Sequence, residues 1–142
     1  MKISDSVINK LIINSKKAFR RGEIPVSAII LDKNGNIISS SYNKRQRKCN
    51  VLGHAEVSCI MKVERKIKDW RLNNYVMIVT LEPCDMCSMI IKECRIDKVY
   101  YFLERNDKNK YDFFINKVLI ENYDSEKKLF KKLLTSFFDN KR

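Results

Sequence analysis

The chain has a single histidine among its 142 residues, and the surroundings of this histidine constrain the fold more than any other feature. His54 stands two positions before Glu56, and a cysteine pair, Cys84 and Cys87, follows Pro83. Cysteines at positions i and i+3 on the first turn of a helix point the same way, and the helix dipole favours their thiolate form. Zinc prefers such sulfur and imidazole ligands. A fold that brings the three side chains together would therefore bind a metal ion.

The number of ligands separates an open metal site from a closed structural one, which needs four. Cys49, Cys59 and Cys94 could in principle supply a fourth. Cys59 lies five residues beyond His54 and Cys94 seven beyond Cys87, away from the direction of the ligands. We interpret these three as small buried or half-buried thiols, with a ligand role as the alternative. The open position then suits a water, whose pKa bound zinc lowers to about 7.

Glu56 is the residue that would make such a site hydrolytic. A carboxylate two positions after a ligand can reach a water at the metal without being a ligand itself, and can pass the proton of that water to a substrate. The alternative for a glutamate in a helix is a solvated surface charge. The short distance in sequence between Glu56 and the one histidine favours the catalytic interpretation.

Charge and hydropathy limit the class of partner. The chain carries 29 Lys plus Arg against 17 Asp plus Glu, a formal net charge of +12. This suggests an anionic partner, with nucleic acid first and anionic lipid second, while a compositional bias towards Lys, Ile and Asn is the competing explanation. No apolar run approaches the roughly 18 to 20 residues of a membrane span, and no secretory signal is present. We expect a cytoplasmic protein that contacts no membrane, with reduced cysteines.

Hydrophobic periodicity predicts alternating helices and strands. Apolar residues at spacings of three and four predict helices over 4–21, 54–67, 84–93 and 125–138. Apolar or β-branched runs predict strands over 24–31, 37–42, 75–81 and 99–103, with 118–120 as a candidate fifth. Asn34-Gly35 predicts a hairpin between the first two strands. The pattern implies one layered α/β domain over 1–142, with crossovers after the hairpin.

The sequence resembles the zinc-dependent cytidine and deoxycytidylate deaminase superfamily, whose signature combines His-x-Glu with Pro-Cys-x-x-Cys. Within it the likeness is greatest to the bacterial branch that acts on adenosine in tRNA. The segments that carry the resemblance span nearly the whole chain: 23–26, 42–43, 53–56, 70–73, 79–87, 95–96, 133–134 and 137–138. The resemblance implies a three-layer α/β/α, cytidine-deaminase-like fold with a central mixed sheet of about five strands.

Carried over onto this sequence, the resemblance implies hydrolytic deamination of adenosine to inosine at the wobble position of tRNA anticodons. His54, Cys84 and Cys87 would hold one Zn²⁺ per subunit of a homodimer, and Glu56 would be the catalytic proton shuttle. Two alternatives stay open. One is a zinc deaminase of a free base, nucleoside, nucleotide or other nucleic acid. The other is a non-catalytic, zinc-stabilised RNA-binding domain.

The resemblance also implies three substrate-binding residues. Asn43 would hydrogen-bond the flipped nucleoside, because its amide offers both a donor and an acceptor. Val26 would pack on the face of the base, and the N–H of Ala55 would meet the base edge. The alternative for Asn43 is an asparagine that simply ends a strand. The alternative for Val26 and Ala55 is an ordinary core or helix-start residue.

Basic residues near the pocket are candidate contacts to the tRNA anticodon loop. The connection before the histidine and the end of the chain supply them: Lys44, Arg45, Arg47, Lys48 and Arg142. Contact with phosphate would explain their position. A solvated loop is the alternative.

Three places depart from the family pattern. Ser27 stands where the family has Gly, and could narrow the pocket or offer it a hydroxyl. Gly53 stands where the family commonly has Ala, and could loosen the start of the following helix. Residues 104–116 lack the Gly-containing segment of the family, which bears on the identity of the substrate and leaves the catalytic motif intact.

Overall fold

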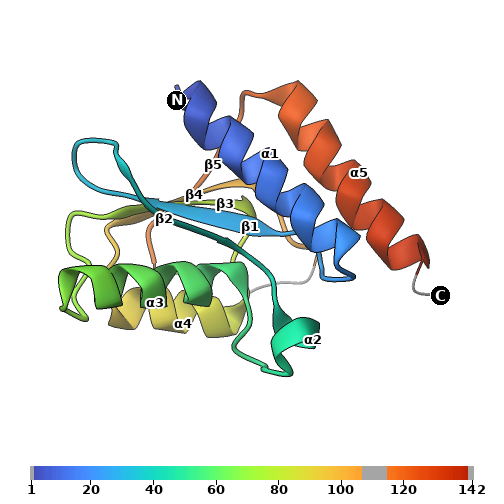
Figure 1. The fold of residues 1–142 in the computed structure, drawn as a ribbon. Helices are drawn as coiled ribbons and strands as arrows, with labels where there is room; N and C mark the ends of the chain where they lie inside the picture. Colours follow the sequence, from blue (N-terminus) through green and yellow to red (C-terminus); the bar gives the residue numbers. More distant parts are fainter. Residues whose placement is uncertain (1, 107–114, 141–142) are drawn as a thin grey trace.

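The computed structural model describes residues 2–106 and 115–140 as a five-stranded sheet between two helical layers (Figure 1). The helices are α1 (Asp5–Arg20), α2 (Arg45–Lys48), α3 (Ala55–Ile67), α4 (Asp85–Glu93) and α5 (Asp124–Asn140). The strands are β1 (Ser27–Leu31), β2 (Ile37–Tyr42), β3 (Val76–Leu81), β4 (Lys98–Leu103) and β5 (Lys117–Leu119). Helices α1 and α5 cover one face of the sheet, and α3 and α4 cover the other (Figure 1). The predicted three-layer α/β/α fold is confirmed.

The sheet is mixed, with the strand order β2-β1-β3-β4-β5. Strand β1 is antiparallel to both β2 and β3, whereas β3, β4 and β5 run parallel. The predicted hairpin joins β1 and β2: Gly35 has a φ of +83°, and the Asp32 carboxylate accepts the N–H groups of Asn34 and Asn36. The carboxyl ends of β2 and β3 lead into α2 and α4, so both motif segments start at one end of the sheet.

Alternation along β1 divides the core between the two layers. Ala28 and Ile30 belong to the hydrophobic cluster that includes residues of α3 and α4, whereas Ile29 belongs to the cluster that includes residues of α1 and α5. Successive strand residues point to opposite faces, and both faces of β1 are covered. This explains why the strand reads as a continuous apolar run rather than an alternating one.

The boundaries differ from the predicted ones in a few places. The strand predicted from residue 24 begins at Ser27, and the helices predicted from His54 and Cys84 begin one residue later because both residues are N-caps. Helix α2 was not predicted, since a helix of four residues is too short to show a periodic pattern. In the described parts of the chain, none of the helices combines the length and the apolar character that a membrane span requires.

Ser27 faces α1 and not the pocket. Its hydroxyl donates to the carbonyl oxygen of Leu11 at 2.8 Å and lies 2.8 Å from Ser15 Oγ, and its backbone N–H donates to Thr80 Oγ1 at 3.2 Å. The expectation that Ser27 narrows the pocket or offers it a hydroxyl is therefore wrong. Alternation along the strand turns this side chain into the opposite layer, where it ties β1 to α1.

We predict that Ser27→Ala lowers the free energy of unfolding by about 1–3 kcal/mol, because the buried Leu11 carbonyl and Ser15 hydroxyl lose a partner. Urea denaturation followed by circular dichroism measures the change. Ser40→Ala on β2 is the matched control, with an expected change within about 0.5 kcal/mol. An equal effect of the two substitutions would contradict the assigned role of Ser27.

Candidate metal centre

Two helices begin at the same point of the structure and bring the motif residues together. His54 is the N-cap of α3, Cys84 is the N-cap of α4, and Cys87 lies on the first turn of α4. His54 Nδ1 lies 3.5 Å from Cys87 Sγ and 3.8 Å from Cys84 Sγ. The ligand atoms of the three residues all lie within 4.8 Å of one another.

This geometry fits a zinc ion. Tetrahedral zinc with Zn–S bonds of about 2.3 Å and a Zn–N bond of about 2.0 Å places sulfur and nitrogen ligands about 3.5 Å apart. The two distances from His54 Nδ1 lie close to that value. Cys87 is buried, whereas His54 and Cys84 are half-buried, and both of the latter line a cavity. A set of three protein ligands beside a cavity suits an open site rather than a closed structural one.

The thiols have unequal proton affinities. The hydrogen bond from Cys87, together with a contact to His54, lowers the pKa of Cys84 to about 3. The pKa of Cys87 is raised, because this thiol is hydrogen-bonded to Cys84 and is buried. The hydrogen bond with Cys84 raises the pKa of His54. The thiolate form is therefore favoured more at Cys84 than at Cys87, and Cys84 lies at the N-terminus of α4, where the helix dipole favours negative charge.

Glu56 lies on the first turn of α3 and is only 4% exposed. Its pKa is raised, first by burial and then by the negative charge of Cys84. Burial excludes the alternative that this residue is a solvated surface charge. A carboxyl group at the wall of the cavity, next to the ligand residues, is placed to accept and release protons.

The three expected substrate-binding residues are linked by hydrogen bonds. Asn43 is buried, and its Oδ1 accepts the N–H of Ala55 at 2.9 Å. The N–H of Asn43 donates to the carbonyl oxygen of Val26 at 3.1 Å. The side-chain NH₂ of Asn43 thus has donors to offer to a ligand in the cavity that it lines. The N–H of Ala55, expected to meet a base edge, already donates to Asn43, so a base would have to share or exchange that hydrogen bond.

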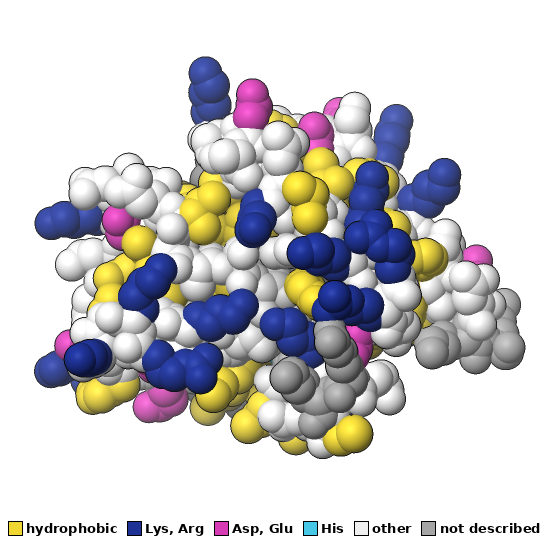
Figure 2. Space-filling model, viewed as in Figure 1, with side chains coloured by type: hydrophobic (Ala, Val, Ile, Leu, Met, Phe, Trp, Pro, Cys, Tyr) yellow, Lys and Arg dark blue, Asp and Glu magenta, His cyan; other side chains and the backbone are white. Residues whose placement is uncertain are grey.

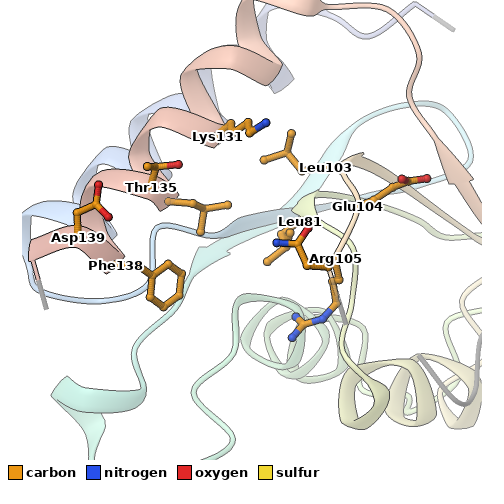
Figure 3. Close-up of a pocket in the computed structure, with 10 residues that line it drawn as sticks. Leu81, Leu103, Glu104, Arg105, Lys131, Thr135, Phe138 and Asp139 are labelled. Atoms are coloured by element: carbon orange, nitrogen blue, oxygen red, sulfur yellow. The ribbon is translucent and has the colours of Figure 1, made fainter. Parts of the chain in front are cut away.

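His54, Glu56 and Cys84 line a cavity of about 150 Å³. A groove of about 630 Å³ adjoins it, and Leu81, Arg105, Leu134 and Phe138 line both. Figure 3 shows this groove between α5, which carries Phe138, and the ends of β3 and β4, which carry Leu81 and Leu103. Phe138 is 53% exposed, whereas its neighbour Phe137 is buried. The cavity therefore opens beside an aromatic side chain that is not used in the core.

The basic residues expected near the site are placed only in part. Arg45 lines the cavity, and Lys44 Nζ lies 4.8 Å from the centroid of the Tyr42 ring. The backbone of Arg47 and Lys48 forms half of α2, but their side chains lie outside what the structure describes. Arg142 lies outside the described residues.

The remaining cysteines lie away from the centre. Cys59 donates to the carbonyl oxygen of Ala28 at 3.1 Å, and burial raises its pKa to about 12. Cys94 is also buried, and burial raises its pKa to about 11. The interpretation as buried thiols is confirmed for these two. It is wrong for Cys49, which is exposed after α2 in a left-handed conformation with a φ of 50°.

Sequence reasoning missed the residues that hold α2 against the cavity. Glu23 is 2% exposed, and its Oε1 accepts the N–H of Gln46 at 3.1 Å. The carbonyl oxygen of Gly53 accepts the N–H of Lys44 at 2.7 Å, and a Cβ at Gly53 would lie 2.7 Å from Arg45 N. Gly53 therefore permits a close backbone approach, and the expectation that it loosens the start of α3 stays a prediction. The position of Gly53 directly before His54 is the sequence feature that could have indicated this close approach.

A buried ion pair next to the cysteines was also missed. Glu82 precedes Pro83, and its Oε2 lies 2.5 Å from Lys117 Nζ on β5, with both side chains largely buried. The other oxygen, Oε1, accepts the N–H of Arg105 at 3.1 Å. Glu82 stands in the motif, but nothing in the sequence indicates a partner on β5.

The chain is similar in sequence to known deaminases. Residues 1–103 match the model of the cytidine and deoxycytidylate deaminase zinc-binding region. The tRNA-specific adenosine deaminase of Rickettsia bellii (strain RML369-C) is 44% identical over 85 residues, which are 59% of this chain and 59% of that protein. The tRNA-specific adenosine deaminase of Buchnera aphidicola subsp. Schizaphis graminum is 32% identical over 133 residues, 88% of this chain and 87% of that protein.

Solved structures share the fold. A structure from a study of A-to-I editing by tRNA:A34 deaminases at the wobble position of transfer RNA superposes with a TM-score of 0.81 at 22% identity, and covers 92% of this chain and 100% of that one. The guanine deaminase of Bacillus subtilis superposes with a TM-score of 0.66 at 25% identity, over 74% of this chain and 68% of that one.

We predict that Cys87→Ala purifies with less than about a tenth of the zinc of the parent protein, because an open site cannot spare one of three ligands. Elemental analysis of the dialysed protein measures the metal content. Cys94→Ala, which removes another buried thiol of α4's C-terminal end, is expected to keep its zinc. Zinc retained by Cys87→Ala would remove this residue from the ligand set.

We further predict that Gly53→Ala displaces the segment from Lys44 to Gln46 and lowers the turnover of substrate at least about tenfold. The reason is that Arg45, in this segment, forms part of the cavity wall. Gly35→Ala is the control. It places a Cβ at a positive φ with no atom within 4 Å, so it costs about 1–2 kcal/mol of stability without touching the cavity. Equal activity of the two variants would contradict the role of Gly53.

Proposed function

Because the chain belongs to the cytidine and deoxycytidylate deaminase zinc-binding family, we propose that it is a zinc-dependent hydrolase that converts adenosine to inosine at the wobble position of tRNA anticodons. The buried Glu56 beside His54, Cys84 and Cys87 is the observation that carries the proposal. The names of the relatives from Rickettsia and Buchnera support the choice of substrate. The aligned region spans 59% of the Rickettsia protein, so the substrate of this chain is part of the proposal.

Glu56 would move the protons of the reaction. Zinc, when held by His54, Cys84 and Cys87, supplies the Lewis acidity that lets a water lose its proton near neutral pH. The Glu56 carboxylate takes up that proton and delivers it to N1 of the adenine ring, which makes C6 a better electrophile. The oxygen of that water would add to C6, and Glu56 would then carry the remaining proton of this oxygen to the amino group, which leaves as ammonia when the C6–N bond breaks. Burial suits the task, because a raised pKa lets the carboxyl group both accept and release protons.

Asn43, Val26 and Ala55 would bind the flipped nucleoside. The Asn43 amide is held by the Ala55 N–H, so its NH₂ group is oriented before the substrate arrives. Val26 offers an apolar wall of the cavity to the face of the base. An anticodon loop presents an adenosine that is already accessible, whereas a duplex would have to be unpaired first.

The wider proposal concerns RNA, subunits and location. Lys44, Arg45, Arg47, Lys48 and Arg142 would contact the phosphates of the anticodon arm. We infer one zinc ion per chain, one deaminase domain over 1–142 and a cytoplasmic location. We also infer a homodimer. Met61 on α3 and Met89 on α4 are 49% and 37% exposed, and a second copy would cover these apolar side chains.

A free base is the second candidate substrate, favoured by the structural similarity to a guanine deaminase. The same assay separates the two. The purified protein is incubated with a tRNA that carries adenosine at the wobble position, and in parallel with adenosine, guanine and cytidine. Inosine formed in the tRNA supports the proposal, and turnover of a free base or nucleoside at a comparable rate would replace it.

We predict that Glu56→Gln lowers inosine formation by about 10²–10⁴-fold, the usual contribution of general acid–base catalysis, while zinc stays bound. Glu64→Gln is the matched control, a half-buried glutamate of the same helix that does not line the cavity. Inosine is quantified in the digested tRNA by mass spectrometry. If Glu56→Gln keeps full RNA binding and no activity of the parent protein can be detected, the non-catalytic RNA-binding domain becomes the better description.

A further inference from the structure

Two lysines of α3 reach across to β2, one of the two edge strands of the sheet, and bind its backbone. Lys62 Nζ donates to the carbonyl oxygen of Ser40 at 2.8 Å, and Lys66 Nζ donates to that of Ile38 at 3.1 Å. The two lysines lie four residues apart on α3 and so share one side of this helix. The two carbonyl groups lie two residues apart on β2, which holds the two ammonium groups about 7 Å apart along the strand.

The series of cations continues towards the cavity. Arg21 Nη1 donates to Tyr42 Oη at 2.7 Å, and Lys44 Nζ lies 4.8 Å from the centroid of the same ring. Tyr42 ends β2 and precedes Asn43, which lines the catalytic cavity. Arg21, Lys44, Lys62 and Lys66 therefore form a line along β2 that ends at the site. We call these four residues the β2 cation row.

The surroundings of the β2 cation row are electropositive. Strand β2, with the sequence Ile-Ile-Ser-Ser-Ser-Tyr, contributes no acidic residue. Figure 2 shows Lys and Arg side chains gathered across the face that carries β2 and α3, with most of the visible acidic side chains towards its margins. Exposed lysines normally lose rotamer entropy when they bind a partner. Here Lys62 and Lys66 are already held by backbone carbonyls, so less entropy remains to be lost.

We propose that the β2 cation row binds the phosphate backbone of the RNA whose adenosine enters the cavity. The inference rests on the proposed function and names a surface of this chain outside the pocket. An ammonium group that gives one N–H to a carbonyl keeps two for phosphate oxygens. A line of spaced cations matches a chain of repeating charges, whereas a membrane surface calls for a planar basic patch with apolar anchors. Such contacts orient the RNA without reading its bases.

Lys62 and Lys66 cover carbonyl groups of an edge strand, and this also has a structural use, since it keeps other strands from pairing with that edge. Two double variants separate the roles. Lys62→Gln with Lys66→Gln removes the charges but keeps an N–H donor for each carbonyl of β2. Lys62→Met with Lys66→Met removes both the charges and the N–H donors. Lys98→Met with Lys128→Met is the matched control for net charge, because these lysines lie on β4 and α5 and not on the β2 side of the sheet.

The test measures dissociation constants by fluorescence anisotropy, with a tRNA anticodon stem-loop that carries adenosine at the wobble position. All proteins contain Glu56→Gln, which prevents turnover. We expect the Gln double variant to bind about 5- to 20-fold more weakly at about 100 mM salt, and the slope of log K against log salt to fall by about 1.5–2. The same loss is expected for a stem-loop with guanosine at the wobble position, because phosphate contacts do not depend on sequence.

The outcomes are distinct. Unchanged binding by the Gln double variant, with self-association of the Met double variant in sedimentation, would overturn the proposal and leave only protection of the edge. An equal loss in the Lys98 and Lys128 control would also overturn it, because net charge would then account for binding. If the protein with Glu56 intact forms no inosine in any RNA, the proposed function is wrong. If that protein deaminates tRNA but the Gln double variant binds RNA as tightly as its parent, only the proposed role of the β2 cation row is wrong.

Discussion

The meeting of two helix N-termini is the constraint on which the rest of the site depends. His54 and Cys84 are the N-caps of α3 and α4, so the positive ends of both helix dipoles point at the space between three ligand atoms. This field favours the thiolate of Cys84 and any further negative charge that a metal brings to the site. It also explains how Glu56 can be buried on the first turn of α3. A carboxylate there lies at the end of the helix where negative charge is least unfavourable.

Hydrogen bonds to backbone N–H groups and a close backbone approach hold one wall of the cavity in place. Asn43 joins the end of β2 to the start of α3, Glu23 holds the N–H of Gln46, and Gly53 lets this segment approach closely. The contact of Glu23 joins parts of the chain that lie 23 residues apart, whereas the other two close the loop between Asn43 and Ala55. A segment too short to form a stable helix alone is thereby kept in one conformation. The cavity is therefore formed before a ligand is bound, which reduces the entropy that binding must overcome.

The sequence predicts most of the fold and the ligand set, because both rest on local patterns. Spacing alone places Cys84 and Cys87 on one turn. The direction of Ser27 could also have been predicted: if Val26 faces the cavity, period-two alternation turns the next residue away. The pair of Glu82 and Lys117 and the contacts of Lys62 could not, because each joins positions on different elements. Neither spacing nor hydropathy says which lysine meets which acceptor when the chain folds.

The same ion pair explains why a changed connection after β4 need not disturb the chemistry. Strand β4 ends at Leu103, and the N–H of Arg105 then donates to Glu82 Oε1. The chain returns to the sheet at β5, where Lys117 Nζ pairs with Glu82 Oε2. One carboxylate thus fixes both ends of the connection, and it lies two residues before Cys84. Because both ends are anchored there, the length and sequence between them can change while the cysteines stay in place. Glu104, Arg105 and Asn106 at the start of this connection line the groove, so we expect variation there to change what the groove accepts rather than the metal centre.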